Sequence, residues 1–349
     1  MSNTNGHPEV INKPQWHDGL RELYRDLIDN TSTLVPCLEW DFHLPWIDAI
    51  QQLKKQRDAI ILAHSYQSPE VFYGVADITG DSFQLAQAAA QCTQNTIVLA
   101  GVHFMAESAK ILAPDKTVLI PDLQAGCSLA ESITAEDVRK LRAQYPGVPV
   151  VVYVNTSAAV KAEADACCTS ANALQVVEAM NAPRVLFLPD QYLGKYVATQ
   201  TNVELIFWQG SCEVHERFTV SDARQARQKY NAHLLVHPEC TPEVIAEADF
   251  VGSTSAMVRW IDKYRPAKVA LITECSMGDN LRAKFPKIDF VRPCQLCPHM
   301  KRIDLPKIFQ CLNTMSPAIE LSEDIIFRAK KGLQKMLAIG RGENLNGVN

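Results

Sequence analysis

Three cysteines recur at a constant interval, each among Gly, Gln, Ser and Pro. Cys127 stands in LQAGCSL, Cys212 in WQGSCEVH and Cys297 in CQLCPHM. The two intervals are 212 − 127 = 85 and 297 − 212 = 85 residues. Cys294, the other half of the C-x-x-C pair, is out of this register. We therefore expect Cys297 to act with two cysteines that are distant in the sequence, and not with Cys294.

Three thiolates that converge on one point would make an unusual metal site. Structural zinc takes four protein ligands, and catalytic zinc takes mostly nitrogen and oxygen. A [4Fe–4S] cluster normally takes four thiolates, so three would leave one iron open to a substrate. Such an iron can assist the loss of a hydroxyl group as water. The cysteine count favours a dehydratase-like centre; the alternative is that duplicated domains retain a small buried residue at one place.

The segments that position these cysteines are also repeated. One phrase occurs three times: Ala-Asp, a short apolar or small stretch, and a hydroxyl residue five positions after the Asp. The Asp residues are separated by 165 − 77 = 88 and 249 − 165 = 84 residues. The three copies are ADITGDS (76–82), ADACCTS (164–170) and ADFVGST (248–254).

Apolar runs typical of buried strands alternate with helical stretches around each phrase. One run precedes the phrase, and two follow it after a helical stretch. This alternation predicts βαβ units with parallel sheets. The runs are 59–67, 96–101 and 117–122 in the first unit, 150–158, 184–190 and 203–208 in the second, and 233–241, 268–274 and 287–293 in the third.

The repeat predicts an α/β fold of three homologous three-layer αβα domains. Their parallel sheets would be arranged with pseudo-threefold symmetry around a central active site. Each unit of about 85 residues is a plausible small domain. We expect domains at 46–130, 131–215 and 216–300, an N-terminal extension at 1–45, and C-terminal helices at 301–349 that pack back on the domains.

Polar side chains stand at equivalent ends of these elements. A hydroxyl where a strand passes into a helix either caps the helix or helps to bind an anion, and capping is the more common role for any one residue. Acid, base and amide groups at the strand tips can move protons in isomerisation, imine formation and dehydration. The hydroxyl residues are Ser82, Ser170 and Thr254; the strand tips carry His64, Tyr66, Tyr153, Asn155, His237 and Glu239.

Composition excludes several classes of protein. The 349 residues are 47% hydrophobic and 21% charged, as in an ordinary globular protein, and the net charge of −5 argues against a nucleic-acid or anionic-membrane surface. The longest apolar runs, such as VPVVVYV, are too short to span a bilayer. Glycine-rich nucleotide loops of either common type are absent from the sequence. Residues 1–16 lack a signal-peptide pattern and are expected to form a tail.

Eleven cysteines without an export signal indicate a reducing, cytoplasmic compartment, where thiols act as ligands, nucleophiles or buried filler. Cys167 and Cys168 fit a short buried strand. Because Cys294 and Cys297 are close in sequence, we hypothesise that they form a reversible disulfide that switches cluster binding off. The segment CLEWDFHLP (37–45) is expected to be a packing arm.

A series of segments resembles the quinolinate synthase family. The resemblance runs in order from about residue 58 to 301, about seventy per cent of the chain, and YVNTSAAVKAEAD and CPHM are its specific parts. Ser65 differs from the Asn that many members carry. The segments are AHSYQ, GDS, GVHFMAESAKIL, LQAGCSLA, VVVYVNTSAAVKAEAD, CTSANA, WQGSCEVH, LLVHPE, GSTSAM and CPHM.

The resemblance implies three α/β domains around a [4Fe–4S] cluster, and condensation of iminoaspartate with dihydroxyacetone phosphate. The products would be quinolinate, phosphate and water, in de novo NAD biosynthesis. L-Aspartate oxidase would supply the imine through transient contact. Residue by residue, it implies Cys127, Cys212 and Cys297 as cluster ligands, with the fourth iron open to substrate.

The same resemblance implies roles for the polar residues. Tyr66 and Glu239 match an acid/base pair for isomerisation and ring closure. Met105 matches an apolar wall, and His215 lies close to the cluster; both could equally serve packing. The residues that match substrate carboxylate and phosphate ligands are His64, Ser82, Tyr153, Asn155, Ser170, His237 and Thr254.

Two other classes of protein stay open at this point. One is a non-catalytic iron–sulfur or metal sensor, which needs a DNA- or partner-binding element, and neither a basic stripe nor a helix-turn-helix pattern is visible in the sequence. The other is a zinc-dependent lyase that uses Cys127, Cys212 and His215. It predicts a colourless protein with stoichiometric zinc, whereas a cluster makes the protein brown.

Overall fold

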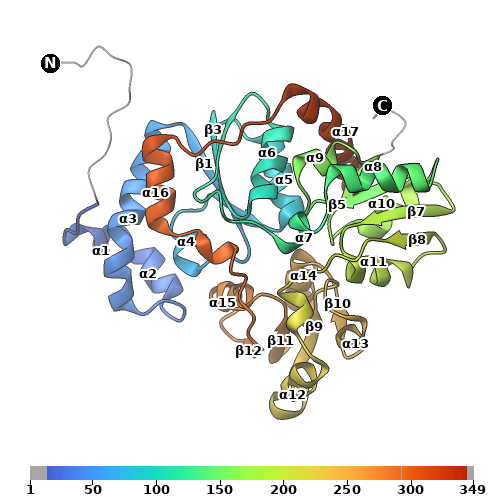
Figure 1. The fold of residues 1–349 in the computed structure, drawn as a ribbon. Helices are drawn as coiled ribbons and strands as arrows, with labels where there is room; N and C mark the ends of the chain where they lie inside the picture. Colours follow the sequence, from blue (N-terminus) through green and yellow to red (C-terminus); the bar gives the residue numbers. More distant parts are fainter. Residues whose placement is uncertain (1–13, 292, 344–349) are drawn as a thin grey trace.

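Three parallel sheets of four strands each form the framework of the protein. The computed structural model describes residues 14–291 and 293–343, and Figure 1 shows the sheets as three neighbouring lobes. In sheet order the first sheet is β2 (Ile78–Gly80), β1 (Ala59–His64), β3 (Thr96–Ala100) and β4 (Thr117–Leu119). The second is β6 (Ala166–Cys168), β5 (Val150–Tyr153), β7 (Arg184–Leu188) and β8 (Glu204–Phe207). The third is β10 (Phe250–Val251), β9 (His233–Val236), β11 (Lys268–Ile272) and β12 (Asp289–Val291).

The strand order is the same in all three sheets: the second strand along the chain, then the first, the third and the fourth. All pairs within the sheets are parallel. The predicted α/β class is therefore confirmed. The repeated phrase itself supplies the short edge strand of each sheet, and Cys167 and Cys168 lie fully buried in one of these, as expected.

Helices connect the strands. The first unit contains α4 (Pro69–Phe72), α5 (Ser82–Gln91) and α6 (His103–Leu112). The second contains α9 (Ala158–Lys161), α10 (Ala173–Ala179) and α11 (Gln191–Ala198), preceded by α7 (Ser128–Glu131) and α8 (Ala135–Gln144). The third contains α13 (Pro242–Ile245), α14 (Thr254–Tyr264) and α15 (Cys275–Lys284), preceded by the 3₁₀ turn η1 (His215–Arg217) and α12 (Val220–Tyr230).

The repeated Asp of the ADxxxxS/T phrase has a structural role. In each unit its carboxylate accepts a hydrogen bond from a backbone N–H of the first strand, which satisfies a donor that the short edge strand leaves unpaired. A nearby Lys or Arg then pairs with the same carboxylate. The three bonds are Ile61 N to Asp77 Oδ2 at 2.8 Å, Val150 N to Asp165 Oδ2 at 2.7 Å and Leu234 N to Asp249 Oδ2 at 2.8 Å.

Alternate residues of β1 enter two different cores, because successive side chains of a strand point to opposite faces. Ile60 and Leu62 belong to the large core that continues into the second sheet and part of the third. Ile61 and Ala63 face a separate core. The N-terminal helices α1 (Gly19–Leu23), α2 (Arg25–Thr31) and α3 (Cys37–Gln56) and the C-terminal α16 (Leu305–Thr314) contribute to that second core.

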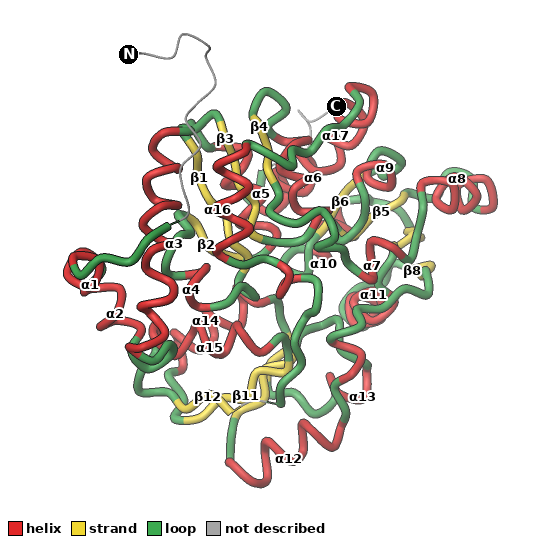
Figure 2. Tube along the Cα trace, turned by 60° about the vertical axis from the view of Figure 1, so that its left-hand side comes forward, coloured by secondary structure: helices red, strands yellow, loops and turns green. Residues whose placement is uncertain are grey.

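The two C-terminal helices pack on different units. Helix α16, which follows the 3₁₀ turn η2 (Met300–Arg302), lies along α3 on the first unit (Figure 2). Helix α17 (Glu323–Gly340) contacts α6 of the first unit and α9, α10 and β6 of the second. Helix α17 thus bridges the first and second units, which also contact each other through α6 and α9.

Two boundaries in the fold differ from what the sequence suggests. The segment 37–45 is the first half of α3, so a boundary at 45/46 would cut this helix, which continues through Pro45. Most of the expected tail, residues 1–13, lies outside the described residues. The C-terminal strand of the third sheet covers only Asp289–Val291 of the predicted 287–293. Within residues 14–291 and 293–343, the helices all fall short of the length and apolarity needed to cross a membrane.

Candidate active site

A cavity lies where the three units meet. Its walls contain every residue for which the sequence predicts a site role, although these residues come from segments up to 233 positions apart (297 − 64). The predicted residues in its lining are His64, Tyr66, Ser82, Met105, Cys127, Tyr153, Asn155, Ser170, Cys212, His237, Glu239, Thr254 and Cys297.

Equivalent ends of the three sheets face this cavity. The carboxyl ends of parallel strands meet at one edge of a sheet, and α/β folds bind ligands there. The first strands β1, β5 and β9 end at or just before the polar tips, the edge strands lead to the hydroxyl residues, and the last strands lead to the cysteines. The cavity therefore brings together three sets of groups, each supplied by all three units.

The loops that carry the three cysteines are joined to one another. Ser128, which follows Cys127, donates a hydrogen bond to the carbonyl of Ser211 at 3.3 Å and accepts one from the backbone N–H of Glu213 at 3.1 Å. Glu213 also pairs with His299 at 2.9 Å. His299 lies two residues beyond Cys297, so the second loop contacts both of the others.

Burial keeps the three thiols protonated while they have no ligand. It raises the pKa of Cys127 to about 12, and the charge of Glu239 adds to the rise. Burial, then Glu239 and Cys127, raise the pKa of Cys212 well above its ordinary value, and burial raises that of Cys297. A bound cation would displace the protons of the thiols that ligate it.

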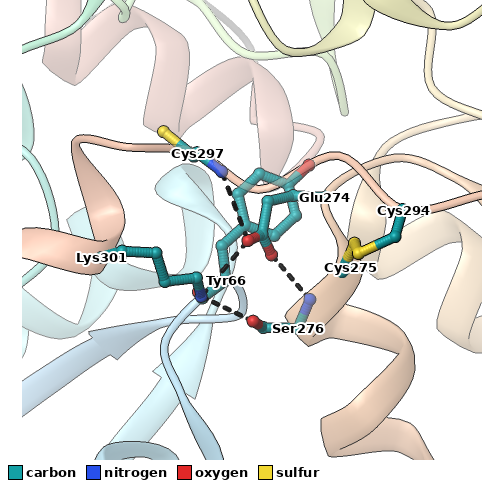
Figure 3. Close-up of a disulfide and its surroundings, with 7 residues drawn as sticks. All are labelled: Tyr66, Glu274, Cys275, Ser276, Cys294, Cys297 and Lys301. Carbon is teal, nitrogen blue, oxygen red and sulfur yellow. Dashed lines mark hydrogen bonds and ion pairs between the residues drawn. A yellow bond between two sulfur atoms is a disulfide. The ribbon is translucent and has the colours of Figure 1, made fainter.

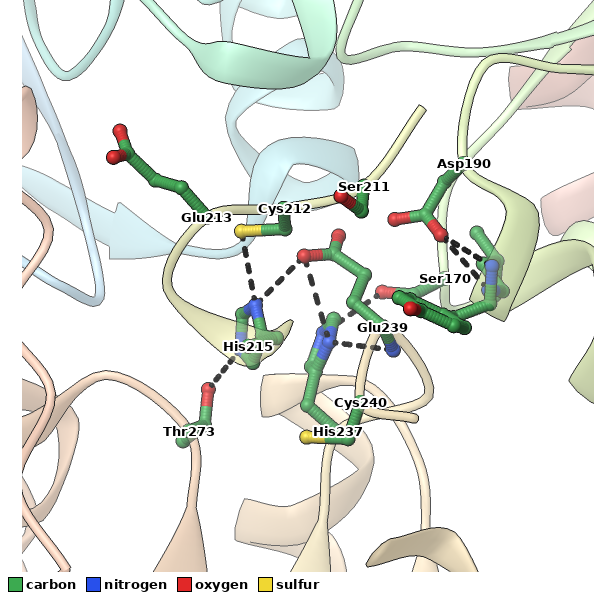
Figure 4. Close-up of polar contacts among 12 residues, drawn as sticks. Ser170, Asp190, Ser211, Cys212, Glu213, His215, His237, Glu239, Cys240 and Thr273 are labelled. Carbon is green, nitrogen blue, oxygen red and sulfur yellow. Dashed lines mark hydrogen bonds and ion pairs between the residues drawn. The ribbon is translucent and has the colours of Figure 1, made fainter. Parts of the chain in front are cut away.

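Glu239 is the centre of a hydrogen-bonded network that reaches Cys212 through His215 (Figure 4). The Tyr153 hydroxyl donates to its Oε1, and Oε2 lies 2.8 Å from His215 Nδ1. Burial opposes ionisation of Glu239, but His237, His215 and the hydrogen bonds from His215 and Tyr153 outweigh it and hold the pKa below its usual range. Glu239 is therefore an ionised, buried carboxylate.

Two tyrosines and two histidines near Glu239 are uncharged. Burial and the Glu239 charge raise the pKa of Tyr66 and of Tyr153 well above 10, so both remain protonated. Burial lowers the pKa of His64 to about 3, and burial with the neighbouring His215 lowers that of His237 to about 3. These protonated phenols and neutral imidazoles lie beside the Glu239 carboxylate.

Thr273 was not identified from the sequence, although it joins two parts of the site. Its hydroxyl lies 2.6 Å from Tyr66 Oη and 2.8 Å from His215 Nε2, so a continuous network runs from Tyr66 through Thr273 and His215 to Glu239. The position could have been found from the repeat, because Thr273 directly follows β11, the third strand of its unit along the chain. The sequence prediction considered only the tips of the first strands.

Two of the three hydroxyl residues do not cap their helices, because the residue before each one is the cap. Asp81 caps α5 in a capping box, and Ser253 caps α14 by accepting the N–H of Ala256. Their successors Ser82 and Thr254 are therefore the first helical residues, and both line the cavity. Ser170 also lines it, with Oγ 3.4 Å from His237 Nε2. Capping by the preceding residue frees Ser82 and Thr254 to face a ligand, and the interpretation of these two as caps is wrong.

Cys294 pairs with a different partner from the one predicted (Figure 3). It forms a disulfide with Cys275, the first residue of α15, while Cys297 is a free thiol. Cys294 and Cys275 are 19 residues apart in sequence, but the backbone of Gln295 bonds that of Cys275 at 3.1 Å and aligns the two segments. The hypothesis of a Cys294–Cys297 disulfide is wrong, because Cys294 is paired with Cys275.

Next to the disulfide, Glu274 and Lys301 link the first and third units (Figure 3). The two side chains lie 3.2 Å apart, and the Glu274 side chain is fully buried. Lys301 Nζ also donates to the carbonyl of Tyr66 at 2.6 Å and to Ser276 Oγ at 2.5 Å. Glu274 in turn accepts a long bond of 3.5 Å from the N–H of Cys297, so this pair connects an acid/base tip to a cysteine loop.

A second set of groups could also hold a metal ion. The donor atoms of Cys212, His215 and Glu239 lie within 4.8 Å of one another. This set differs from the zinc alternative derived from the sequence, because Glu239 replaces Cys127. The His215 Nδ1 to Glu239 Oε2 distance of 2.8 Å is a direct hydrogen bond.

Comparison with known proteins identifies the family. The family model described as "Quinolinate synthetase A protein" matches residues 48–338, most of the chain. The chain belongs to the quinolinate synthetase A family. It is therefore an enzyme, and the sensor interpretation is excluded.

Curated relatives of this quinolinate synthetase A family member align with it over most of their own lengths. "Quinolinate synthase 1" of Mesorhizobium japonicum is 58% identical over 314 residues, 90% of this chain and 97% of the relative. "Quinolinate synthase" of Agrobacterium fabrum is 54% identical over 90% of this chain and 91% of the relative. A Xylella fastidiosa protein of the same name is 54% identical over 84% of this chain and 87% of the relative.

Proposed function

We propose that the chain condenses iminoaspartate with dihydroxyacetone phosphate to form quinolinate, with loss of phosphate and water, in de novo NAD biosynthesis. The observation that carries the proposal is the convergence of three thiols, three hydroxyl residues and an acid/base network on one cavity, in a member of the quinolinate synthetase A family. L-Aspartate oxidase would supply the unstable imine through transient contact.

The hydroxyl wall of the cavity suits anionic substrates. Ser82, Ser170 and Thr254 stand at or near the starts of α5, α10 and α14, where helix N-termini favour negative charge. Asn155 adds an amide whose Oδ1 is buried without a protein partner, which leaves it available to a ligand. We assign the phosphate and carboxylate groups of the two substrates to this wall, together with His64, Tyr153 and His237.

The network around Glu239 suits proton transfer. An ionised carboxylate can accept a proton, and a protonated phenol can donate one. We assign Glu239 and Tyr66 as the acid/base pair for isomerisation and ring closure, with Tyr153 holding the Glu239 carboxylate in place. Thr273 links Tyr66 to the same network, so a proton that leaves one member can be replaced through the others. Met105 forms part of the apolar wall beside them.

The donor set of the cysteine wall fits a [4Fe–4S] cluster. Cys127, Cys212 and Cys297 are the cavity-lining cysteines, and thiolates are the ligands that such clusters take. When bound through three thiolates, the cluster would supply a Lewis-acidic iron that is open to substrate. His215 lies 3.2 Å from Cys212 Sγ and can orient that ligand.

Iron and sulfide counts test the ligand assignment. We expect about four irons per chain in anaerobically purified wild type and a loss of most iron in Cys127→Ser, Cys212→Ser and Cys297→Ser. Cys92→Ser is the matched control, since Cys92 is a free cysteine outside the cavity lining. An intact cluster in any of the three ligand variants would refute the assignment.

Metal analysis of the same preparations also separates the two chemistries. A zinc-dependent lyase would give colourless protein with about one zinc per chain, which would be lost in His215→Ala and Glu239→Gln. A cluster gives brown protein whose iron survives Glu239→Gln, because that residue does not belong to the three-thiol set. The nine free thiols suit a reducing compartment, and we propose that the enzyme works in the cytoplasm.

A further inference from the structure

Asp190 is a buried carboxyl group to which the proposed reaction assigns no role. It follows β7 and is fully buried, with 0% of its surface exposed. Its Oδ1 caps α11 by accepting the N–H groups of Tyr192 at 2.8 Å and Leu193 at 3.0 Å. Its Oδ2 is buried without a hydrogen-bond partner. Oδ1 thus serves as the helix cap, and the capping role does not account for Oδ2.

The unpaired oxygen faces the acid/base network. In Figure 4 the second oxygen of Asp190 points toward the side of the Glu239 carboxylate, away from α11. Asp190 and Glu239 act on each other electrostatically, and Tyr153 is affected by the charge of Asp190 as well. Asp190 does not line the cavity, so any influence on the reaction must pass through Glu239 and Tyr153.

In the third unit, the residue at the position equivalent to Asp190 is paired with a cation. Glu274 is equivalent to Asp190 (274 − 190 = 84): each caps the helix after its strand, and each forms a bridge to the following loop. Glu274 pairs with Lys301 at 3.2 Å. The residue equivalent to Lys301 in the second unit is Glu216 (301 − 216 = 85), which is an acid. Asp190 therefore occupies the same place without the cation.

The surroundings of Asp190 disfavour a second negative charge. Burial, then Glu239, raise its pKa well above the ordinary value, and Glu216 adds to the rise against two backbone hydrogen bonds. Each of the groups that face it is neutral or becomes an anion when it ionises. The titratable groups around Asp190 in the described structure are Tyr153, Cys168, Tyr192, Glu216, Glu239 and Cys240.

We propose that Asp190 is a positioning residue that holds a proton on Oδ2, so that Glu239 is the ionised member of this pair of buried carboxyl groups. The inference rests on the proposed acid/base role of Glu239. A neutral Asp190 lets the cavity accept substrates that already carry several negative charges. Ionisation of Asp190 would place a second buried anion behind Glu239 and would weaken the binding of these substrates.

The protonation state can be measured without any activity. Asp190→Asn keeps the size of the side chain and the oxygen that caps α11, because Asn and Asp are about equally good caps. We expect the infrared C=O stretching band of a protonated carboxylic acid in substrate-free wild type at neutral pH, and its loss in Asp190→Asn. As a matched control, Glu274→Gln should retain the acid band that is assigned to Asp190. An unchanged acid band in Asp190→Asn would overturn the proposal.

The pH dependence of stability gives a second readout. A carboxyl whose pKa is raised by folding binds more protons in the folded state, so the wild type loses stability as pH rises above about 3.9. Asp190→Asn does not titrate and lacks this loss. We therefore expect the Tm of Asp190→Asn to exceed that of wild type by a margin that grows between pH 5 and pH 8. A margin that is constant with pH would contradict the proposal.

Steady-state kinetics test the link to substrate binding. As Asp190 ionises with rising pH, the KM of wild type for dihydroxyacetone phosphate should rise more than kcat falls, because an added charge acts first on binding. In Asp190→Asn this rise in KM should be absent. Superimposable KM profiles for the two proteins would show that Asp190 has no effect on binding. Failure of the reaction itself would instead remove activity from both proteins and leave the infrared result unaffected.

Discussion

At the scale of the residue, burial decides the charge state of each group in the site. His64 and His237 are neutral because a buried imidazolium is costly, whereas Glu239 is ionised because it has hydrogen-bond donors on both oxygens. The sequence identifies these residue types at the strand tips. It does not state their charges, because the pKa of each depends on neighbours from other units.

His64 makes a testable contribution to acid sensitivity. Its pKa is lowered to about 3, so between pH 6.5 and pH 3 the unfolded chain binds a proton there that the folded chain does not. Stability is therefore lost as pH falls below about 6.5, by about 1.4 kcal/mol per pH unit for this group. We expect the Tm of metal-free His64→Gln to fall less than that of wild type between pH 7 and pH 5.

Two comparisons make the acid measurement specific. His103→Gln, which replaces a histidine with a side chain 38% exposed, should follow the wild-type curve. The difference between His64→Gln and wild type should also disappear above pH 7, where both states of His64 are neutral. Parallel curves for wild type and His64→Gln across the whole range would mean that His64 is protonated in the folded protein.

At the scale of the element, two strand-to-helix junctions use neighbouring residues for helix capping and for lining the cavity. Asp81 and Ser253 cap their helices, and the hydroxyl that follows each one lines the cavity. A hydroxyl cannot serve a helix cap and a substrate fully at once, so this division leaves Ser82 and Thr254 available. The repeated phrase indicates a hydroxyl at the junction, but the exact first residue of the helix decides which of two adjacent residues is the cap.

The pair Ser253 and Thr254 allows the two jobs to be separated. Ser253→Ala should lower stability by about 1 kcal/mol through loss of the cap and leave KM close to the wild-type value. Thr254→Val should leave Tm nearly unchanged and raise the KM for an anionic substrate at least about tenfold, the effect of losing a hydrogen bond to a charged group. Thermal unfolding and steady-state kinetics on both variants provide the measurements. The reverse pattern would assign capping to Thr254.

At the scale of the whole molecule, the site exists only where three units meet. No single unit contains both the three thiols and the acid/base pair, since Tyr66 and Glu239 lie on β1 and β9 loops of different sheets. We propose three homologous domains related by pseudo-threefold symmetry, on the basis of the shared strand order. The predicted divisions at 130, 215 and 300 fall within the turns α7, η1 and η2, each of which follows a cavity cysteine.

The disulfide between Cys275 and Cys294 predicts a definite number of free thiols. Of eleven cysteines, Cys275 and Cys294 are paired, which leaves 11 − 2 = 9 free thiols. Metal-free protein denatured without reductant should therefore react with nine equivalents of an alkylating agent, measured by mass spectrometry. Cys294→Ser should react with ten, because Cys275 is released. Eleven labelled thiols in wild type would contradict the pairing.

The sequence by itself determined the three-unit α/β plan, the family and the residues that line the cavity. These follow from local information, because buried parallel strands need continuous apolar runs and the repeat brings equivalent positions into register. Only the tertiary structure decided that Cys294 pairs with Cys275, that Thr273 joins Tyr66 to His215, and that Asp190 stands without a cation. Contacts of this kind depend on side chains from distant segments that meet in space, and neither spacing nor composition specifies such meetings.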